Sequence, residues 1–211
     1  TDIYTLSLHD ALPISYICII KNNINTQKME KRCLIAPTEE EIFEREPLLK
    51  FSFFLSERNN WINSTGIEIL SNLDKGFSDL KINSEYIGKA SFLSWFWTLG
   101  VYEIIRTITQ AQDCFSIQFI EAIKKLKKEI ELVRMPSAKM EKKKNGKRKI
   151  PVNSNRCHDY WDIEKKDLLI GEPDNPFSVR LLIKHYDSVF SSLRKEDIVK
   201  RHEESDLYLC Y

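Results

Sequence analysis

The sequence predicts a mainly α-helical fold, in which a helical bundle surrounds a long antiparallel helical hairpin and carries a small β-hairpin insertion. Apolar residues recur at three- and four-residue steps over most of the chain, which is the period of an amphipathic helix. The stretch 160–171 departs from that period, because two short apolar runs flank a charged turn. The chain has 211 residues and a net charge of +1, and the roughly 183 residues from Met29 onward fit one ordinary domain.

The first part of the chain is expected to lie outside this domain. Residues 1–15, read in frame, resemble a DNA adapter from short-read library preparation, so we interpret them as an artefact of a translated sequencing contig. Residues 16–28 are rich in Ile, Asn and Lys, as a translated AT-rich leader would be, and a true strand or linker is the alternative. We therefore expect the native chain to start at Met29 and to form a single α-helical domain over residues 29–211.

A capping box predicts where the first helix begins. Thr38 precedes Glu41 by three residues, a spacing at which each side chain can accept a hydrogen bond from the backbone N–H of the other. We expect a helix from here through Phe43, after which Pro47 either kinks it or opens a second helix.

The next two helices are predicted as separate elements. Residues 48–58 are rich in Leu and Phe and should form a largely buried helix, which Asn59 and Asn60 should end. A second capping box, from Thr65 to Glu68, then opens a shorter amphipathic helix.

The central element is a helical hairpin, in which residues 84–112 pair with residues 117–133 through a short link. The stretch 92–105 is apolar around most of its circumference, so we expect other helices to enclose it, with Trp95 and Trp97 buried. Pro136 should interrupt the second helix of the hairpin.

A β-hairpin and a final helix are predicted near the C-terminus. Residues 160–163 and 168–171 should pair as strands around a charged turn. Asn175 and Pro176 should cap and open the last helix, which extends to about residue 193. Residues 197–211 are predicted to form a polar helical piece with an apolar tip.

Charge is distributed unevenly along the chain. Residues 38–46 hold five Glu and one Arg, whereas residues 122–149 hold twelve Lys or Arg and three Glu, a local net charge of +9. Such a basic run forms a solvated face, a nucleic-acid contact, or a docking site for the protein's own acidic segment. The candidate phosphate-contacting residues lie in the basic loop: Lys142, Lys143, Lys144, Lys147, Arg148 and Lys149.

A second candidate site is a polar cluster between the two central helices. Glu103 and Arg106 are three residues apart on the most apolar helix, where an internal ion pair is the plain explanation. Arg134 and Lys139 flank Pro136 and could present cations to an anionic ligand. We take the four charged residues as ligand-binding candidates and assign no reaction to them.

Arg180 and His185 have the R-x4-H spacing, which resembles the motif of HEPN-type ribonucleases. That family is helical and metal-independent, and the resemblance implies that His185 handles protons while Arg180 stabilises charge on a phosphate. The match departs from the family at Leu181, where a polar residue is usual. On a straight helix a five-residue step rotates by about 140°, so the alternative is that both residues lie on the edges of an amphipathic helix.

Metal, cofactor and membrane chemistry are not indicated. Cys157, His158 and Asp159 are adjacent and have no second cluster at zinc spacing, and no glycine-rich phosphate loop is present, so we expect neither a metal nor a cofactor. No stretch is long and apolar enough for a membrane helix. The cysteines that follow Met29 are scattered, which favours reduced thiols in a cytoplasmic protein; they are Cys33, Cys114, Cys157 and Cys210.

Two function classes follow from these patterns. The leading hypothesis is a non-enzymatic helical interaction module whose basic loop contacts an anionic protein or nucleic-acid partner, and formation of a homo-oligomer is left open. The alternative is a HEPN-like ribonuclease that uses Arg180 and His185.

Overall fold

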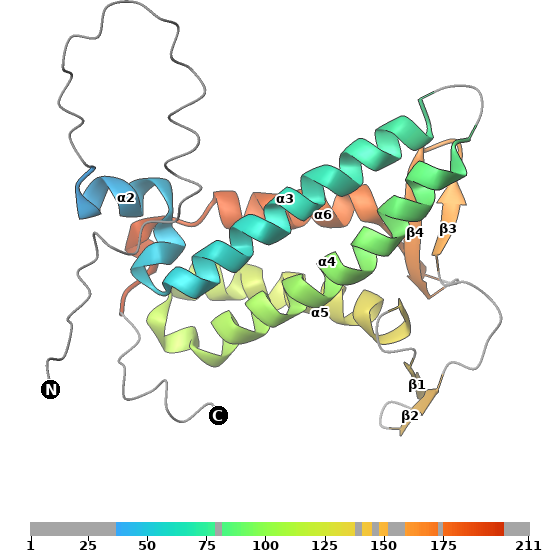
Figure 1. Cartoon of the computed structure of the whole chain (residues 1–211). Helices are drawn as coiled ribbons and strands as arrows, with labels where there is room; N and C mark the ends of the chain where they lie inside the picture. The colour runs from blue at the N-terminus through green and yellow to red at the C-terminus, as the bar shows by residue number, and fades with distance from the viewer. Residues whose placement is uncertain are drawn as a thin grey trace, which may run out of the picture. The chain divides into compact units, whose positions relative to one another are not determined.

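The computed structural model describes residues 37–78, 82–137, 141–144, 148–151, 159–172 and 175–200 (Figure 1). For residues 137–158 the description covers the backbone of the helix and strands only. The fold is mainly α-helical with a small β insertion, as predicted. The adapter, the leader and the start at Met29 fall outside the described residues and stay predictions.

The first helix begins as its capping box predicts. Helix α2 (Glu39–Arg45) follows Thr38, whose Oγ1 accepts from the Glu41 N–H at 3.3 Å, while the Glu41 carboxylate accepts from the Thr38 N–H at 2.8 Å. Pro47 then opens the short 3-10 helix η2 (Pro47–Lys50), because the proline ring presets the backbone for a first helical position.

Helix α3 (Phe53–Gly76) corrects the prediction of two separate helices. It begins after Ser52, whose Oγ accepts from a first-turn N–H at 3.3 Å, and it continues for 24 residues. Asn59 and Asn60 therefore do not end a helix, and the Thr65 capping box does not begin one: the Thr65 hydroxyl donates to a backbone carbonyl one turn earlier, at 2.8 Å. Packing outweighs the local capping preference of the polar residues in the middle of α3. Before and after them, buried apolar residues recur at helical spacing: Leu55, Ile69 and Leu73.

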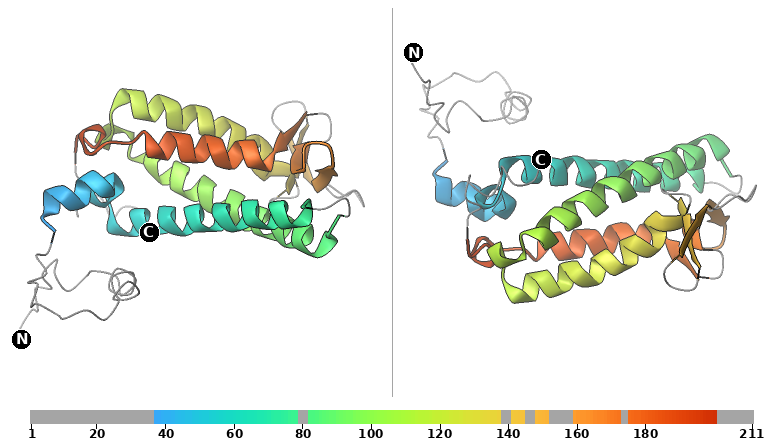
Figure 2. Two further views of the ribbon diagram at one scale, coloured as in Figure 1. Left: turned by 90° about the horizontal axis from the view of Figure 1, so that it is seen from above. Right: turned by 90° about the horizontal axis from the view of Figure 1, so that it is seen from below.

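The central pair of helices comprises α4 (Ser84–Gln110) and α5 (Ile117–Ser137). They run antiparallel, since the Arg134 guanidinium lies 3.8 Å from the centre of the Tyr102 ring and Lys127 Nζ donates to Thr109 Oγ1 at 3.2 Å. Pro136 does not interrupt α5, which contains it and ends one residue later. Helix α4 crosses from beside α3 to beside α5 (Figure 2).

The core forms where α3, α4, α5 and α6 (Val179–Ser191) meet. The Trp97 indole lies edge-on to the Tyr186 ring of α6, with ring centres 5.7 Å apart. The side of α4 that faces the core is a row of fully buried residues: Ile87, Ala90, Trp97, Val101, Ile104, Ile105 and Ile108.

The opposite side of α4 is open, so the prediction that residues 92–105 are enclosed is wrong for this face. Phe92, Trp95 and Phe96 are 60%, 37% and 47% exposed. Within the described chain the main neighbours of α4 are α3 and α5, which cover only part of its circumference. Trp97 is buried as predicted, whereas Trp95 is not, because a helix that is apolar nearly all round needs more neighbours than these.

A three-stranded antiparallel sheet precedes α6, with β4 in the middle. Its strands are β3 (Asp159–Asp162), β4 (Asp167–Glu172) and β5 (Asn175–Ser178). The predicted β3–β4 hairpin is confirmed, with Asp162 opposite Asp167. Asn175 and Pro176 lie in β5 and do not open the last helix, because the second edge of β4 pairs with this segment. Ser178 caps α6 in their place, and its hydroxyl donates to the buried Asp167 carboxylate.

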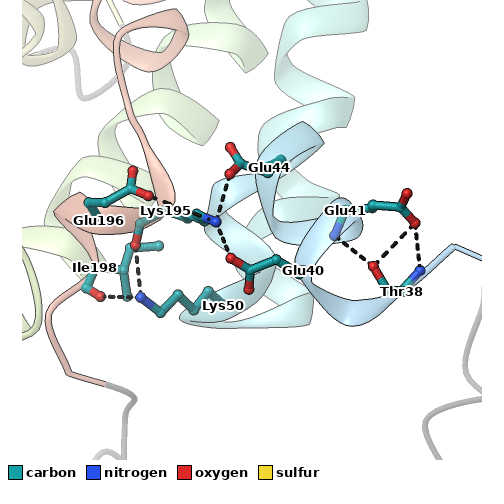
Figure 3. A network of polar contacts seen from close by, with 8 residues as sticks. All are labelled: Thr38, Glu40, Glu41, Glu44, Lys50, Lys195, Glu196 and Ile198. Carbon is teal, nitrogen blue, oxygen red and sulfur yellow. Dashed lines mark hydrogen bonds and ion pairs between the residues drawn. The ribbon is translucent and has the colours of Figure 1, made fainter.

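The segment after α6 is held against the N-terminal helices by two lysines (Figure 3). Lys195 Nζ contacts the carboxylates of Glu40 and Glu44 on α2, and the second contact measures 2.6 Å. Lys50 Nζ donates to two backbone carbonyls of the C-terminal segment, each at 2.8 Å. The only helical turn described here is η4 (Lys195–Asp197), so residues 198–200 correct the predicted helix, and residues 201–211 lie outside the description.

Candidate functional site

The basic loop forms a second β-hairpin. Strands β1 (Glu141–Lys144) and β2 (Arg148–Pro151) pair antiparallel, and Lys147 lies outside the described residues. The register opposes Lys143 to Lys149, Lys144 to Arg148, and Lys142 to Ile150. Two neighbouring cross-strand pairs are therefore both cationic, and like charges directly opposite each other destabilise strand pairing.

The positive charge is concentrated on this hairpin rather than on the helix that leads into it. Residues 141–151 contain six Lys or Arg and one Glu, a net charge of +5. Helix α5 contacts β1 and exposes Lys124, Lys125 and Lys128, but it also carries Glu121, Glu129 and Glu131. A two-stranded hairpin is marginally stable by itself, so repulsion between its strands weighs heavily on it.

The acidic segment of the chain is engaged elsewhere, which corrects the interpretation that it docks on the basic run. Glu40 and Glu44 contact Lys195, and the hydrogen bond from this lysine lowers the pKa of Glu40. The bonds to the two carboxylates in turn raise the pKa of Lys195. The Glu46 carboxylate accepts from Ser56 Oγ at 3.2 Å and Asn60 Nδ2 at 3.3 Å. Glu40, Glu44 and Glu46 are thus engaged by residues of the helical part of the structure.

The predicted polar cluster is divided in the structure. Glu103 and Arg106 form an ion pair at 2.7 Å, but their side chains are 48% and 50% exposed, so the pair is not internal as predicted. Arg134 stacks on Tyr102 instead of joining the pair, and its Nε is buried with no hydrogen-bond partner among the described residues. Lys139 lies outside the described residues.

The two residues of the R-x4-H motif engage different helices. Arg180 pairs with Asp74 of α3 at 2.8 Å, and its Nε donates to a backbone carbonyl in the β3–β4 turn at 3.0 Å. His185 Nδ1 lies 2.6 Å from the Glu129 carboxylate of α5. The five-residue step therefore points the two side chains to opposite neighbours of α6, and the structure does not bring them to one ligand.

A cavity of about 420 Å³ lies between η2, the first half of α3 and the end of α6. Asn59 Oδ1 accepts from the Tyr186 hydroxyl at 2.6 Å, and burial raises the pKa of that hydroxyl. Asn63 Oδ1 is buried with no partner in the described part of the chain, and desolvation raises the pKa of Asp187 at the cavity. Sequence reasoning missed this cavity, since residues that line it, such as Asn59 and Asp187, lie far apart along the chain.

Sequence reasoning also missed the exposed aromatic rings of α4. Trp61 of the neighbouring helix α3 is exposed as well, at 59%. The sequence contained an indication of this surface. Beside the residues of α4 that face the core, a second set of residues recurs at alternating three- and four-residue steps. We call this set the outer stripe: Lys89, Phe92, Phe96, Leu99, Glu103 and Arg106.

Comparisons with protein families, with curated proteins and with solved structures gave no match. None of the helices in the described ranges is long and apolar enough to cross a membrane. Cys114 is buried, whereas Cys33, Cys157, His158 and Cys210 fall outside the description.

Proposed function

We propose that this chain is a helical interaction module whose β1–β2 hairpin binds the phosphate backbone of a nucleic acid. The observation that carries the proposal is the register, which sets Lys143 against Lys149 and Lys144 against Arg148. Opposed cations destabilise the hairpin when it is free. An anionic strand lying along the hairpin would neutralise both members of each pair and so favour the paired strands.

The proposal specifies backbone contact without base recognition. Residues 141–151 contain no aromatic side chain on which a base could stack. Contacts from Lys and Arg to phosphates position a protein on nucleic acid but carry no sequence information. We therefore expect binding that varies little with sequence and falls steeply as salt is added.

Salt dependence provides the test. The whole chain is titrated into a short labelled single-stranded RNA, and fluorescence anisotropy gives the affinity at several salt concentrations. If all six cations of the hairpin contact phosphates, the slope of log K against log salt approaches about −4. Removing the opposed pair with Lys143→Gln and Lys149→Gln should reduce the slope by about 1.4.

The matched control removes the same charge from α5 through Lys124→Gln and Lys125→Gln. These lysines are exposed but lie outside the hairpin, so the control should keep the slope of the unmodified chain. Equal losses in the two double variants, or no RNA binding at low salt, would contradict the proposal.

The HEPN-like ribonuclease stays a prediction, and the same mixtures test it in the presence of EDTA. Cleavage that is lost in both Arg180→Ala and His185→Ala would support it, whereas RNA recovered intact would count against it. Release from Asp74 and Glu129 would have to precede any such activity, because these carboxylates hold the two side chains in the structure. The cytoplasmic location predicted from the thiols also stays a prediction.

A further inference from the structure

The outer stripe of α4 has the pattern of a helix that packs lengthwise against another helix. Its six positions follow heptad spacing, with Phe92, Phe96 and Leu99 at the centre and charged residues at both ends. The rings of Phe92 and Phe96 touch edge-on with their centres 4.9 Å apart, and Trp95 lies 4.6 Å from Phe96. These rings are in mutual contact yet remain 37% to 60% exposed, so they form one continuous apolar surface.

Helix α3 extends this surface with Trp61. Lys89 of α4 forms an ion pair with Glu68 of α3 at 2.6 Å, which fixes where the two outer faces meet. The helices are antiparallel, because Gly76 approaches Ile87 at one end of the pair and Gly100 approaches Ile62 towards the other. In α3, Trp61 precedes Glu68 by seven residues, and in α4, Phe96 follows Lys89 by seven. Seven residues are about two helical turns, so each ring lies on the same side of its helix as the residue that forms the ion pair.

We propose that a second copy of this chain covers the outer stripe, with the two α4 helices antiparallel across a twofold axis near Phe96. Lys89 and Glu103 each lie seven residues from Phe96, on opposite sides of it. Antiparallel pairing therefore places Lys89 of one copy opposite Glu103 of the other, and the twofold axis repeats that contact. This charge symmetry is the reason for choosing a second copy as the occupant, since the two ends of the stripe carry opposite charges at equal distances from Phe96.

The charges at each end of the dimer alternate in sign. Lys89 already contacts Glu68, and Glu103 already contacts Arg106 within one copy. Bringing the two pairs together creates a row of four charges, from Glu68 through Lys89 to Glu103 and Arg106 of the second copy. Charges of this kind at the rim of an interface favour one register and one orientation over others.

The exposed area is sufficient for the core of such an interface. Aromatic side chains bury roughly 150–250 Å² each, so the open fractions of Trp61, Phe92, Trp95 and Phe96 amount to about 400 Å² per copy. Two copies would bury about 800 Å² of aromatic surface, roughly half of a standard interface of about 1,600 Å². The charged residues at both ends of the stripe lie around this centre and supply a polar rim.

The proposal extends the interaction module to a second partner, and it does not depend on the basic hairpin. Dimerisation can therefore fail while RNA binding persists, or the reverse, and the two experiments distinguish these results.

Sedimentation of the whole chain over a range of concentrations tests the interface. We expect a concentration-dependent dimer, and replacing both stripe phenylalanines by Phe92→Ser and Phe96→Ser should weaken it roughly 30-fold or more, as loss of an aromatic hot spot does. The control, Ile117→Ser with Leu181→Ser, removes apolar groups that are 79% and 67% exposed on α5 and α6, and it should leave the dimer unchanged. A monomer at all concentrations, or a dimer that survives the stripe substitutions, overturns the proposal.

A charge exchange tests the antiparallel register. Lys89→Glu alone and Glu103→Lys alone each place like charges across the axis, so each variant should dimerise less than the unmodified chain. An equimolar mixture of the two variants restores opposite charges at both ends, and the heterodimer should recover the original affinity. If the mixture associates no better than the single variants, the proposed register is wrong; circular dichroism of each variant confirms that it remains folded.

Discussion

The corner between α3 and α4 gives a prediction whose magnitude follows from the structure. A Cβ atom added at Gly76 would lie 2.5 Å from Ile87 Cγ1 and 3.4 Å from the Ile87 backbone nitrogen. Ile87 is completely buried inside α4, where a β-branched side chain has one strongly preferred rotamer. The isoleucine therefore cannot rotate away, and Gly76→Ala forces the two helices to shift.

The expected cost exceeds the gain in helix propensity. Overpacking a well-packed core typically costs about 1–3 kcal/mol. Replacing Gly by Ala in a helix interior stabilises it by roughly 0.5–1 kcal/mol, and Gly76 is the last residue of α3, where this gain is smaller. We expect Gly76→Ala to lower the free energy of unfolding by about 1–2 kcal/mol.

The neighbouring glycine of α4 provides a matched control. A Cβ added at Gly88 meets nothing within 4 Å, so Gly88→Ala should raise the free energy of unfolding by about 0.5–1 kcal/mol. Urea unfolding followed by far-ultraviolet circular dichroism measures both variants. If Gly76→Ala proves as stable as Gly88→Ala, the close approach of the two helices is not as described here.

A double variant separates crowding from a change in the backbone. Ile87→Ala alone should cost about 2–5 kcal/mol, because it opens a cavity in the core. The double variant Gly76→Ala with Ile87→Ala should lose less free energy of unfolding than the two single variants lose together, since the new methyl group partly fills that cavity. Strict additivity would show that the two residues do not share the same space.

Three further outcomes follow from single contacts. Tyr186→Phe leaves Asn59 Oδ1 without its buried donor and should lower the free energy of unfolding by about 1–3 kcal/mol in urea titrations, whereas an unchanged midpoint would show that water replaces it. Lys195 lowers the pKa of Glu40, and the contact raises the pKa of Lys195 in turn. The contact therefore stabilises α2 at every pH between the ordinary pKa of a glutamate and the ordinary pKa of a lysine. Amide protection factors in α2 should therefore fall as pH drops through the carboxyl range, and pH-independent protection would contradict the contact. Glu103→Gln should change the free energy of unfolding by less than about 0.5 kcal/mol, because its ion pair is half exposed; a larger loss in the same titrations would indicate a buried role.

Contacts between residues close in the sequence could be predicted from the sequence alone. The capping box of Thr38 and Glu41 was found because both partners lie within one helical turn. The hairpin of β3 and β4 was found because alternating strands and a charged turn occur in one short stretch. The ion pair of Glu103 and Arg106 followed from three-residue spacing in the same way, although its exposure did not.

Contacts between distant segments could not be predicted in this way. The continuity of α3 past Asn59 and Asn60 depends on what its buried face packs against, and the pairing of β5 depends on the free edge of β4. Arg180 finds Asp74 more than one hundred residues earlier in the chain, and no local pattern indicates this partner.

The sequence by itself determined that α4 is a long helix with apolar residues around most of its circumference, because helical period and composition are local properties. Only the tertiary structure decided which of its aromatic residues are buried: Trp97 is 2% exposed, while Phe96 beside it in the chain is 47% exposed. Adjacent residues point about 100° apart on a helix, so the positions of α3, α5 and α6 cover one ring and leave the next open. The open rings are the surface on which we propose that a second copy binds, and their location depends on how the helices pack.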